Sequence, residues 1–258
     1  MPKGFFTDTT ICIGCKACEV ACKQWNQLPQ DGYHFSGNSY DNTMHLGGQT
    51  WRHVSFIERP VPLDSAALNG FSWLMMSDVC KHCQRAGCLE ACPTGAIIRT
   101  EFDSVFVQPD ICNGCGYCVS ACPFGVIDRV ESDGRAWKCT LCYDRLKEDM
   151  EPACAKACPT DSILFGEVAE LREKARERVE HLHSRGVGEA YLYGVDQPGT
   201  DGLNAFFLLV DQPEAYNLPP DPVAPTKQAG DAWKSAALAS LGILIATAGA
   251  AFWGSKRR

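Results

Sequence analysis

The stretch CIGCKACEVAC at residues 12–22 decides the fold, because its four cysteines follow the spacing C-x2-C-x2-C-x3-C. Residues 112–122, CNGCGYCVSAC, repeat that spacing and are followed by Pro123. Two further quartets also end in Cys-Pro but have longer middle gaps: Cys80, Cys83, Cys88 and Cys92, and then Cys139, Cys142, Cys154 and Cys158. Together the four quartets account for all 16 cysteines of the chain.

The crowding of these cysteines indicates iron–sulfur clusters. Three cysteines at two-residue gaps can place their thiolates and backbone N–H groups around one [4Fe–4S] cube. The fourth cysteine lies beyond reach of that cube and begins a helix, so we expect it to bind the other cluster of a two-cluster pair. Glycines such as Gly14 and Gly114 let the backbone approach the sulfurs closely. The quartets therefore predict four [4Fe–4S] clusters.

Two other uses of cysteine fit these quartets less well. Disulfides do not need four repeats of one spacing, and cysteines three residues apart pair poorly. Zinc sites favour two C-x-x-C pairs separated by a longer spacer, and only the quartet at residues 139–158 resembles that pattern. Iron–sulfur ligation accounts for every quartet.

The composition argues against several functional classes. The chain has 258 residues and a net charge of −7, and its basic run is confined to residues 256–258, so nothing indicates nucleic-acid binding. No Ser/His/Asp grouping, phosphate loop or flavin fingerprint occurs, so we expect no catalysis by this chain alone. The N-terminus lacks the apolar core of a secretory signal, and export would therefore depend on a partner's signal.

The segments between the motifs predict an α+β fold. Short β-type runs follow three quartets, at residues 96–98, 125–127 and 162–165. Loop, one-turn helix and strand form the repeating unit of a bacterial ferredoxin, so the chain contains four half-ferredoxins. We also predict strands at residues 50–58, 71–76 and 205–211. Residues 167–185 predict an amphipathic helix with Val168, Leu171, Ala175, Val179 and Leu182 along one side.

The C-terminal segment predicts a single transmembrane helix. Residues 236–253 carry no charge, and Trp233 and Trp253 stand 20 residues apart, which is about one hydrocarbon thickness at ~1.5 Å per residue. Gly242, Ala246 and Ala250 form a small-residue stripe suited to packing on another membrane helix. A buried core helix or a surface helix is the alternative. The basic C-terminus predicts a cytoplasmic end and an extracytoplasmic, periplasmic cluster domain.

Several side chains next to the cysteines are candidates for tuning the clusters. A cation can offset cluster charge, and five lysines flank the motifs: Lys16, Lys23, Lys81, Lys138 and Lys156. Lys138 is the strongest of these candidates, and His82 could donate a hydrogen bond. The alternative is that they are solvated lysines and an ordinary loop histidine.

Three stretches together resemble a known family: CIGCKACEVACKQWN at residues 12–26, WKCTLCYDR at residues 137–145 and EPACAKACP at residues 151–159. They resemble the iron–sulfur (β) subunit of membrane-bound formate dehydrogenases, among the four-cluster ferredoxin-like subunits of the molybdopterin oxidoreductase family. The quartets alone are shared with subunits of nitrate, dimethyl sulfoxide and polysulfide reductases and of some hydrogenases. The Cys-x-x-Trp-Asn ending and the apolar tail narrow the resemblance, although Lys23 stands where the other motifs have proline.

The resemblance implies crossed ligation of the four clusters. Cluster 1 would be held by Cys12, Cys15, Cys18 and Cys158, and cluster 2 by Cys22, Cys139, Cys142 and Cys154. Cluster 3 would be held by Cys80, Cys83, Cys88 and Cys122, and cluster 4 by Cys92, Cys112, Cys115 and Cys118. One ferredoxin-like unit (residues 79–136) is then inserted within the other (residues 1–78 and 137–216), before a proline-rich linker (217–231) and a membrane anchor (232–254).

The resemblance also implies a role and partners. Electrons would pass from a catalytic α subunit with a molybdenum or tungsten bis-pterin, through this chain, toward a membrane cytochrome b (γ) subunit and the quinone pool. The alternatives are the same role in a periplasmic hydrogenase or in a sulfur-compound or nitrate-type reductase. A soluble polyferredoxin carrier is a further alternative, against which the apolar tail argues.

Overall fold

The computed structural model describes residues 1–30, 41, 43, 45–60 and 71–255, without the side chains of residues 60, 71 and 249–255. Its strands are β1 (Lys3–Asp8), β2 (Arg52–Pro60), β3 (Phe71–Val79), β4 (Ile97–Arg99), β5 (Val105–Val107), β6 (Asp128–Arg129), β7 (Ala136–Trp137), β8 (Ile163–Glu167), β9 (Tyr191–Tyr193) and β10 (Ala205–Leu209). Its α-helices are α1 (Ala17–Asn26), α2 (Gly87–Glu90), α3 (Tyr117–Ser120), α4 (Tyr143–Lys147), α5 (Ala153–Lys156), α6 (Val168–Ser184) and α7 (Ala229–Ser255). Short 3-10 helices are η1 (Thr9–Ile11), η3 (Pro198–Thr200), η4 (Pro213–Tyr216) and η5 (Pro225–Gln228).

The largest sheet joins the two ends of the cluster-binding region. Its strand order is β8-β1-β10-β9, with β1 parallel to β10 and antiparallel to β8. Because successive side chains of a strand point to opposite faces, Phe5 and Phe6 of β1 enter different cores. Phe6 packs in the core that contains Leu171 of α6, whereas Phe5 belongs to the core that contains Cys18. The sheet thus separates an ordinary apolar core from a cysteine-rich one.

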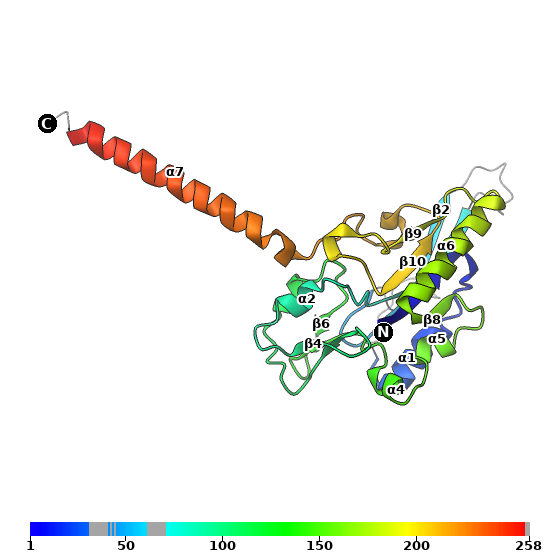
Figure 1. Cartoon of the computed structure of the whole chain (residues 1–258). Coiled ribbons are helices and arrows are strands. Elements are labelled where there is room, and N and C mark those ends of the chain that lie inside the picture. The colour runs from blue at the N-terminus through cyan, green and yellow to red at the C-terminus, as the bar shows by residue number, and fades with distance from the viewer. Residues whose placement is uncertain (31–40, 42, 44, 61–70, 256–258) are drawn as a thin grey trace.

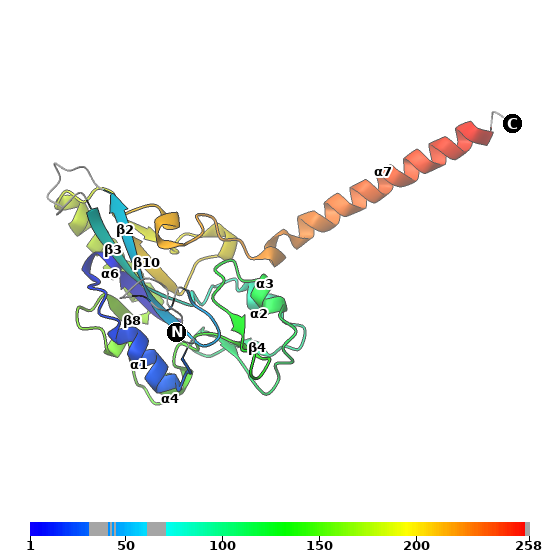
Figure 2. The same cartoon turned by 180° about the vertical axis from the view of Figure 1, so that it is seen from behind.

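Helix α6 confirms the amphipathic helix predicted over residues 167–185. Its buried side chains include Val168, Leu171, Ala175 and Leu182, which recur every three to seven residues and so share one face. The helix packs against β1 and β8 and lies in front of the sheet in Figure 1. Seen from behind, β2 and β3 lie in front instead (Figure 2).

The short helices pack in two pairs, one of which is nested within the other in sequence. Helix α1, which contains the last two cysteines of the first motif, packs against α5 of the last motif, and α2 packs against α3. Strands β4 and β5 form one hairpin beside the second pair, and β6 and β7 form another. The chain therefore contains two ferredoxin-like domains of mixed helix and strand.

Most predicted strands are present. The runs at residues 96–98 and 162–165 overlap β4 and β8, and the strand predicted at 205–211 is β10. The strands predicted at 50–58 and 71–76 are β2 and β3, which pair as an antiparallel hairpin with Arg52 opposite Val79. The strand predicted at 125–127 is wrong, because Gly125 has a φ of +62° and turns the chain; the strand there is β6.

The C-terminal helix α7 projects away from the body of the protein (Figures 1 and 2). Before it, Leu218 and Ala224 of the proline-rich segment are buried against the body. Within the described residues, no helix is both long and apolar enough to span a membrane. Asp231 and Lys234 interrupt the start of α7, and residues 249–254 of the anchor lie outside the described side chains. The transmembrane helix predicted at 232–254 is therefore not confirmed.

Candidate metal centres

The cysteines lie on loops that turn sharply. Gly14 and Lys16 of the first motif and Leu141 and Cys142 of the last motif have positive φ values between 50° and 64°. A left-handed residue reverses the chain over a short distance, so the sulfurs on either side of it converge. At Gly14 a Cβ atom would stand 2.6 Å from Met75 Sδ, so this loop fits closely against the β2–β3 hairpin.

Group one contains Cys12, Cys15, Cys18 and Cys158, which together line one cavity. Three of these come from the first motif and the last from the end of α5, about 140 residues away in the chain. The Sγ atom of Cys18 lies 3.2 Å from the hydroxyl of Ser77. Cys15 is exposed, so this group reaches the protein surface.

Group two contains Cys22, Cys139, Cys142 and Cys154, all of which are buried. Burial raises the pKa of Cys22 well above its usual value, and nearby thiols of the last motif raise it further: Cys154, Cys139 and Cys142. Donors also surround the sulfurs of this group. The backbone N–H of Leu141 donates to Cys139 Sγ at 3.3 Å, and Arg52 Nη2 donates to Cys154 Sγ at 3.3 Å.

Groups three and four complete the set. Burial raises the pKa of Cys83, and so do its neighbours in group three: Cys80, Cys122 and Cys88. Group four lines a second cavity, formed by Cys92, Cys112, Cys115 and Cys118. The backbone N–H of Ala136 donates to Cys112 Sγ at 3.5 Å, and Cys115 is exposed.

The four groups lie next to one another in a series. Burial raises the pKa of Cys18 to about 11, and Cys154 of group two is among the neighbours that raise it. Cys80 of group three likewise raises the pKa of Cys139. Burial raises the pKa of Cys88 to about 12, and Cys118 of group four contributes. The packing agrees: Cys80 shares a core with cysteines of groups one and two, whereas the other cysteines of group three pack with group four in a separate core. The order in space is therefore one, two, three, four.

The chemistry of these donors fits clusters rather than one metal ion. Over the ranges that the structure describes, no three Cys, His, Asp or Glu residues form a group that could hold a single ion. In a cubane each thiolate binds a different iron atom, so its four ligands need not meet at one point. Buried thiols with raised pKa values require a strong positive charge to become thiolates, which iron supplies.

The candidate lysines differ in their surroundings. Lys81 and Lys138 are 1% and 2% exposed, and Lys138 Nζ donates to the backbone oxygens of Val105 and Cys139. Lys16 pairs with Asp41 at 3.1 Å. The other two lysines have different positions: Lys23 donates to the backbone oxygens of Pro29 and Gln49, and Lys156 is exposed. Burial next to cysteines therefore singles out Lys81 and Lys138.

His82 has the protonation that a hydrogen-bond donor needs. Its Nδ1 accepts a hydrogen bond from the backbone N–H of Val105 at 3.0 Å, so the proton of the neutral ring is on Nε2. Burial lowers the pKa of His82 well below its usual value, and Lys138 lowers it further. Its Nε2 is buried and has no hydrogen-bond partner among the described residues.

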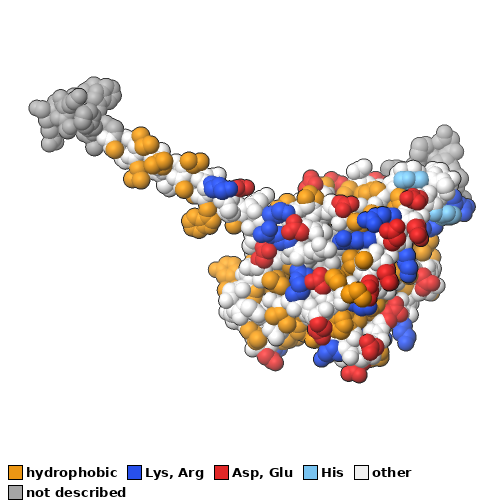
Figure 3. Space-filling model, viewed as in Figure 1, with side chains coloured by type: hydrophobic (Ala, Val, Ile, Leu, Met, Phe, Trp, Pro, Cys, Tyr) orange, Lys and Arg blue, Asp and Glu red, His pale blue; other side chains and the backbone are white. Residues whose placement is uncertain are grey.

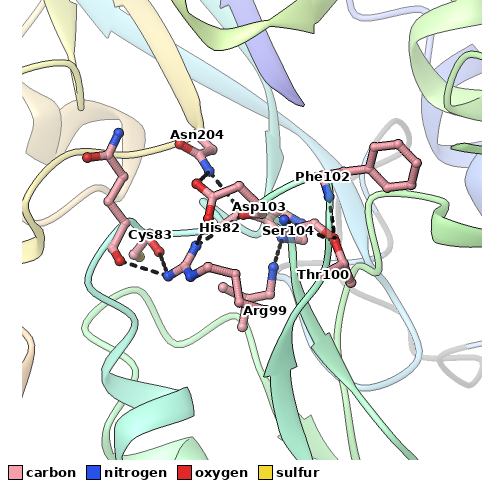
Figure 4. A network of polar contacts seen from close by, with 10 residues as sticks. His82, Cys83, Arg99, Thr100, Phe102, Asp103, Ser104 and Asn204 are labelled. Carbon is pink, nitrogen blue, oxygen red and sulfur yellow. Dashed lines mark hydrogen bonds and ion pairs between the residues drawn. The ribbon is translucent and has the colours of Figure 1, made fainter. Parts of the chain in front are cut away.

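A polar network fixes the loop of group three (Figure 4). Arg99 of β4 donates to the carbonyl oxygen of Cys83 at 2.9 Å and pairs with Asp103 at 3.0 Å. Asn204, just before β10, donates to Asp103 Oδ2 at 2.9 Å. The loop is thus tied to both ferredoxin-like domains.

Arg52 is absent from the sequence prediction, although its guanidinium contacts a cysteine. It lies in the insertion, outside every cysteine motif. No spacing rule connects it with the cysteines, and the available signal is a charged residue within a predicted strand.

Comparisons with known proteins agree with this arrangement. Residues 11–96 and residues 71–168 match two family models, each described as a 4Fe-4S dicluster domain. The nitrate-inducible formate dehydrogenase iron–sulfur subunit of Escherichia coli (strain K12) is 41% identical over 252 residues, which cover 95% of this chain and 82% of the relative. The formate dehydrogenase iron–sulfur subunit of Haemophilus influenzae is 42% identical over 219 residues, 83% of this chain and 68% of the relative. The B subunit of the anaerobic dimethyl sulfoxide reductase of Escherichia coli (strain K12) is 35% identical over 171 residues, 66% of this chain and 76% of the relative.

Proposed function

Since this chain belongs to the family of formate dehydrogenase iron–sulfur subunits, we propose that it relays electrons from a molybdenum- or tungsten-pterin catalytic subunit toward a membrane cytochrome b and the quinone pool. Like its formate dehydrogenase relatives, it is an iron–sulfur electron-transfer subunit and not the catalytic subunit. Its 16 cysteines and two dicluster matches fit four [4Fe–4S] clusters. The observation that carries the function is the serial arrangement of the four cysteine groups, which pack in two adjoining cysteine-containing cores.

The proposed ligand sets are groups one to four, which correspond to clusters 1 to 4. Two observations support them. The four cysteines of group one line one cavity, and those of group four line another. Within group two, and likewise within group three, the thiols raise the pKa of a cysteine of the same group. The paired packing of α1 with α5 and of α2 with α3 supports an inserted second unit.

Side chains of this chain set the conditions for electron transfer. When bound, such clusters accept and release single electrons. Burial of group two excludes water, and backbone donors such as the N–H groups of Leu141 and Ala136 point at cysteine sulfurs. Burial and hydrogen bonds to sulfur are the features by which a protein sets cluster potentials.

The two ends of the series are suited to docking of partners. Group one reaches the surface at Cys15 beside Ile13, which is 58% exposed, and group four reaches it at Cys115 beside Tyr117, which is 61% exposed. The segment η5 that leads into α7 packs against α2, next to groups three and four. We assign the catalytic subunit to the group-one end and the membrane subunit to the group-four end.

Helix α7 is proposed as the membrane anchor, with its C-terminus in the cytoplasm and the clusters outside. Its described apolar side chains are exposed, among them Trp233, Leu238 and Ile243. On the face shown in Figure 3, hydrophobic side chains lie along the projecting helix. A helix that is apolar all round needs lipid or protein around it. The full-length chain should require detergent for extraction from membranes, whereas a chain ending at Gln228 should wash off; equal extraction would remove this part of the proposal.

The function is tested by the electron donor. In washed anaerobic membranes that contain the whole complex, formate should reduce the clusters, as followed by low-temperature EPR, and hydrogen should not. Reduction by hydrogen alone would assign the chain to a hydrogenase. The relative named as a dimethyl sulfoxide reductase subunit keeps a sulfur-compound reductase as a second candidate, although the match covers 66% of this chain rather than 95%. Reoxidation of the clusters by dimethyl sulfoxide would favour it.

The crossed ligand sets are tested by serine variants in the last motif. Cys158→Ser should abolish the same EPR signal as Cys15→Ser, and Cys154→Ser should abolish the same signal as Cys142→Ser. Loss of one common signal from Cys154→Ser and Cys158→Ser would show ligation within a motif and refute the crossed sets.

A further inference from the structure

Arg52, at the start of β2, is an enclosed cation between groups one and two. Its side chain is 1% exposed. Its Nη2 donates to Cys154 Sγ of group two at 3.3 Å, and its Nη1 donates to the Ser77 hydroxyl oxygen at 3.3 Å. The same hydroxyl lies 3.2 Å from Cys18 Sγ of group one. The guanidinium therefore reaches group two directly and group one through a single hydroxyl.

The positive charge of Arg52 needs anionic partners at this position. A buried guanidinium is costly in free energy unless an anion compensates for it. No Asp or Glu forms an ion pair with Arg52 in the described parts of the chain. The Phe5 ring, 4.7 Å from Cζ, adds a cation–π contact, and Nε is buried without a hydrogen-bond partner among the same residues. The anions within reach are the thiolates of the two groups.

We propose that Arg52 is a fixed charge shared by clusters 1 and 2, and that it raises the reduction potential of both. The proposal rests on the ligand sets given above. Electron uptake adds negative charge at each metal site, so a nearby cation favours the reduced state, and burial strengthens the attraction by lowering the local dielectric constant. Because one cation lies near both sites, it raises both reduction potentials and keeps the difference in potential between clusters 1 and 2 small. An arginine suits this role because it stays charged and offers several donors in a fixed plane.

The test is a redox titration of the intact complex, followed by EPR, with clusters assigned by the serine variants. In Arg52→Met the ratio of reduced to oxidised clusters 1 and 2 should fall about tenfold at a fixed ambient potential, equivalent to a midpoint ~59 mV lower. Clusters 3 and 4 should keep their midpoints. Arg52→Lys keeps the charge and should restore most of the shift. Arg59→Met is the matched control, because Arg59 is on the same strand but pairs with Asp211 at 2.8 Å, and it should leave all four midpoints unchanged.

A second variant keeps the proposal testable if Arg52→Met does not assemble. Arg52→Gln removes the charge but keeps a polar side chain of similar length with N–H donors, so clusters 1 and 2 should become harder to reduce, as in Arg52→Met. Unchanged midpoints in an Arg52→Met or Arg52→Gln complex that retains four clusters would overturn the proposal. Failure of the ligand sets is recognised separately, from the signals lost in Cys154→Ser and Cys158→Ser.

Discussion

Gly114, in the loop between Cys112 and Cys115, shows how one backbone position shapes a metal site. Its φ is +73°, and a Cβ atom there would overlap the carbonyl oxygen of Gly134. Gly114→Ala therefore combines left-handed strain of about 1–2 kcal/mol with a backbone clash. The clash displaces the segment from which Ala136 donates to Cys112 Sγ. We expect a lower Tm and loss of the group-four cluster, measured by thermal unfolding and iron content.

Gly125 supplies the control for this variant. Its φ is +62°, but a Cβ atom there would meet nothing within 4 Å. Gly125→Ala should therefore cost the backbone strain alone and should retain the iron of group four. Equal iron loss in both variants would show that the clash with Gly134 is unimportant.

Residue-scale prediction from sequence succeeded where the signal is local. Cluster motifs are short, so their spacing identifies the cysteine ligands. Lys138 was a candidate for tuning a cluster because it is next to a motif cysteine in the sequence. The sequence ranked Lys138 above the other lysines but did not single out Lys81, although both are buried, since burial depends on the tertiary packing around each lysine. Arg52 could not be found, because its closeness to Cys154 depends on how β2 packs.

At the scale of elements, α6 packs its buried face on the apolar core of the sheet. Leu171 is 2% exposed and lies in the core that contains Phe6. Leu171→Ala removes buried methyl groups and leaves a cavity, so we expect the free energy of unfolding to fall by about 2–5 kcal/mol. Because Cys22, Cys139 and Cys154 of group two lie in the other core, the EPR signal of cluster 2 in the native protein should stay the same.

Lys174→Ala is the control for Leu171→Ala, because Lys174 is on the same helix and exposed. Its effect should stay within about 0.5 kcal/mol in chemical denaturation. A loss of the cluster 2 signal from Leu171→Ala under native conditions would contradict the separation of the two cores.

Elements were predictable where a repeated apolar pattern or a preceding cysteine motif marks them. The 17 residues of α6 repeat an apolar face often enough to be recognised. Strand β1 is absent from the sequence prediction, because six residues carry a weak pattern and its parallel partner β10 is about 200 residues away. The packing of α1 with α5 and of α2 with α3 likewise depends on contacts between distant segments, which sequence periodicity does not encode.

At the scale of the whole molecule, the series of groups has exposed ends and an enclosed centre. Cys15 of group one and Cys115 of group four are exposed, whereas all four cysteines of group two are buried. Water, oxidants and chelators reach a cluster through its exposed ligands. We therefore expect the full-length protein, treated anaerobically with ferricyanide and EDTA, to lose clusters 1 and 4 first and cluster 2 last. EPR at successive times, together with iron analysis, measures this order.

The assembled complex provides the comparison for this prediction. If the catalytic subunit covers the group-one end and the membrane subunit covers the group-four end, both end clusters should decay more slowly in the complex, while cluster 2 changes little. Removing the catalytic subunit alone should restore fast loss of cluster 1 and leave cluster 4 protected. Protection of cluster 4 by the catalytic subunit would reverse the proposed direction of the relay. Uniform decay of all four clusters in the free chain would show that access to iron is limited by opening of the whole fold rather than by exposure of the end groups.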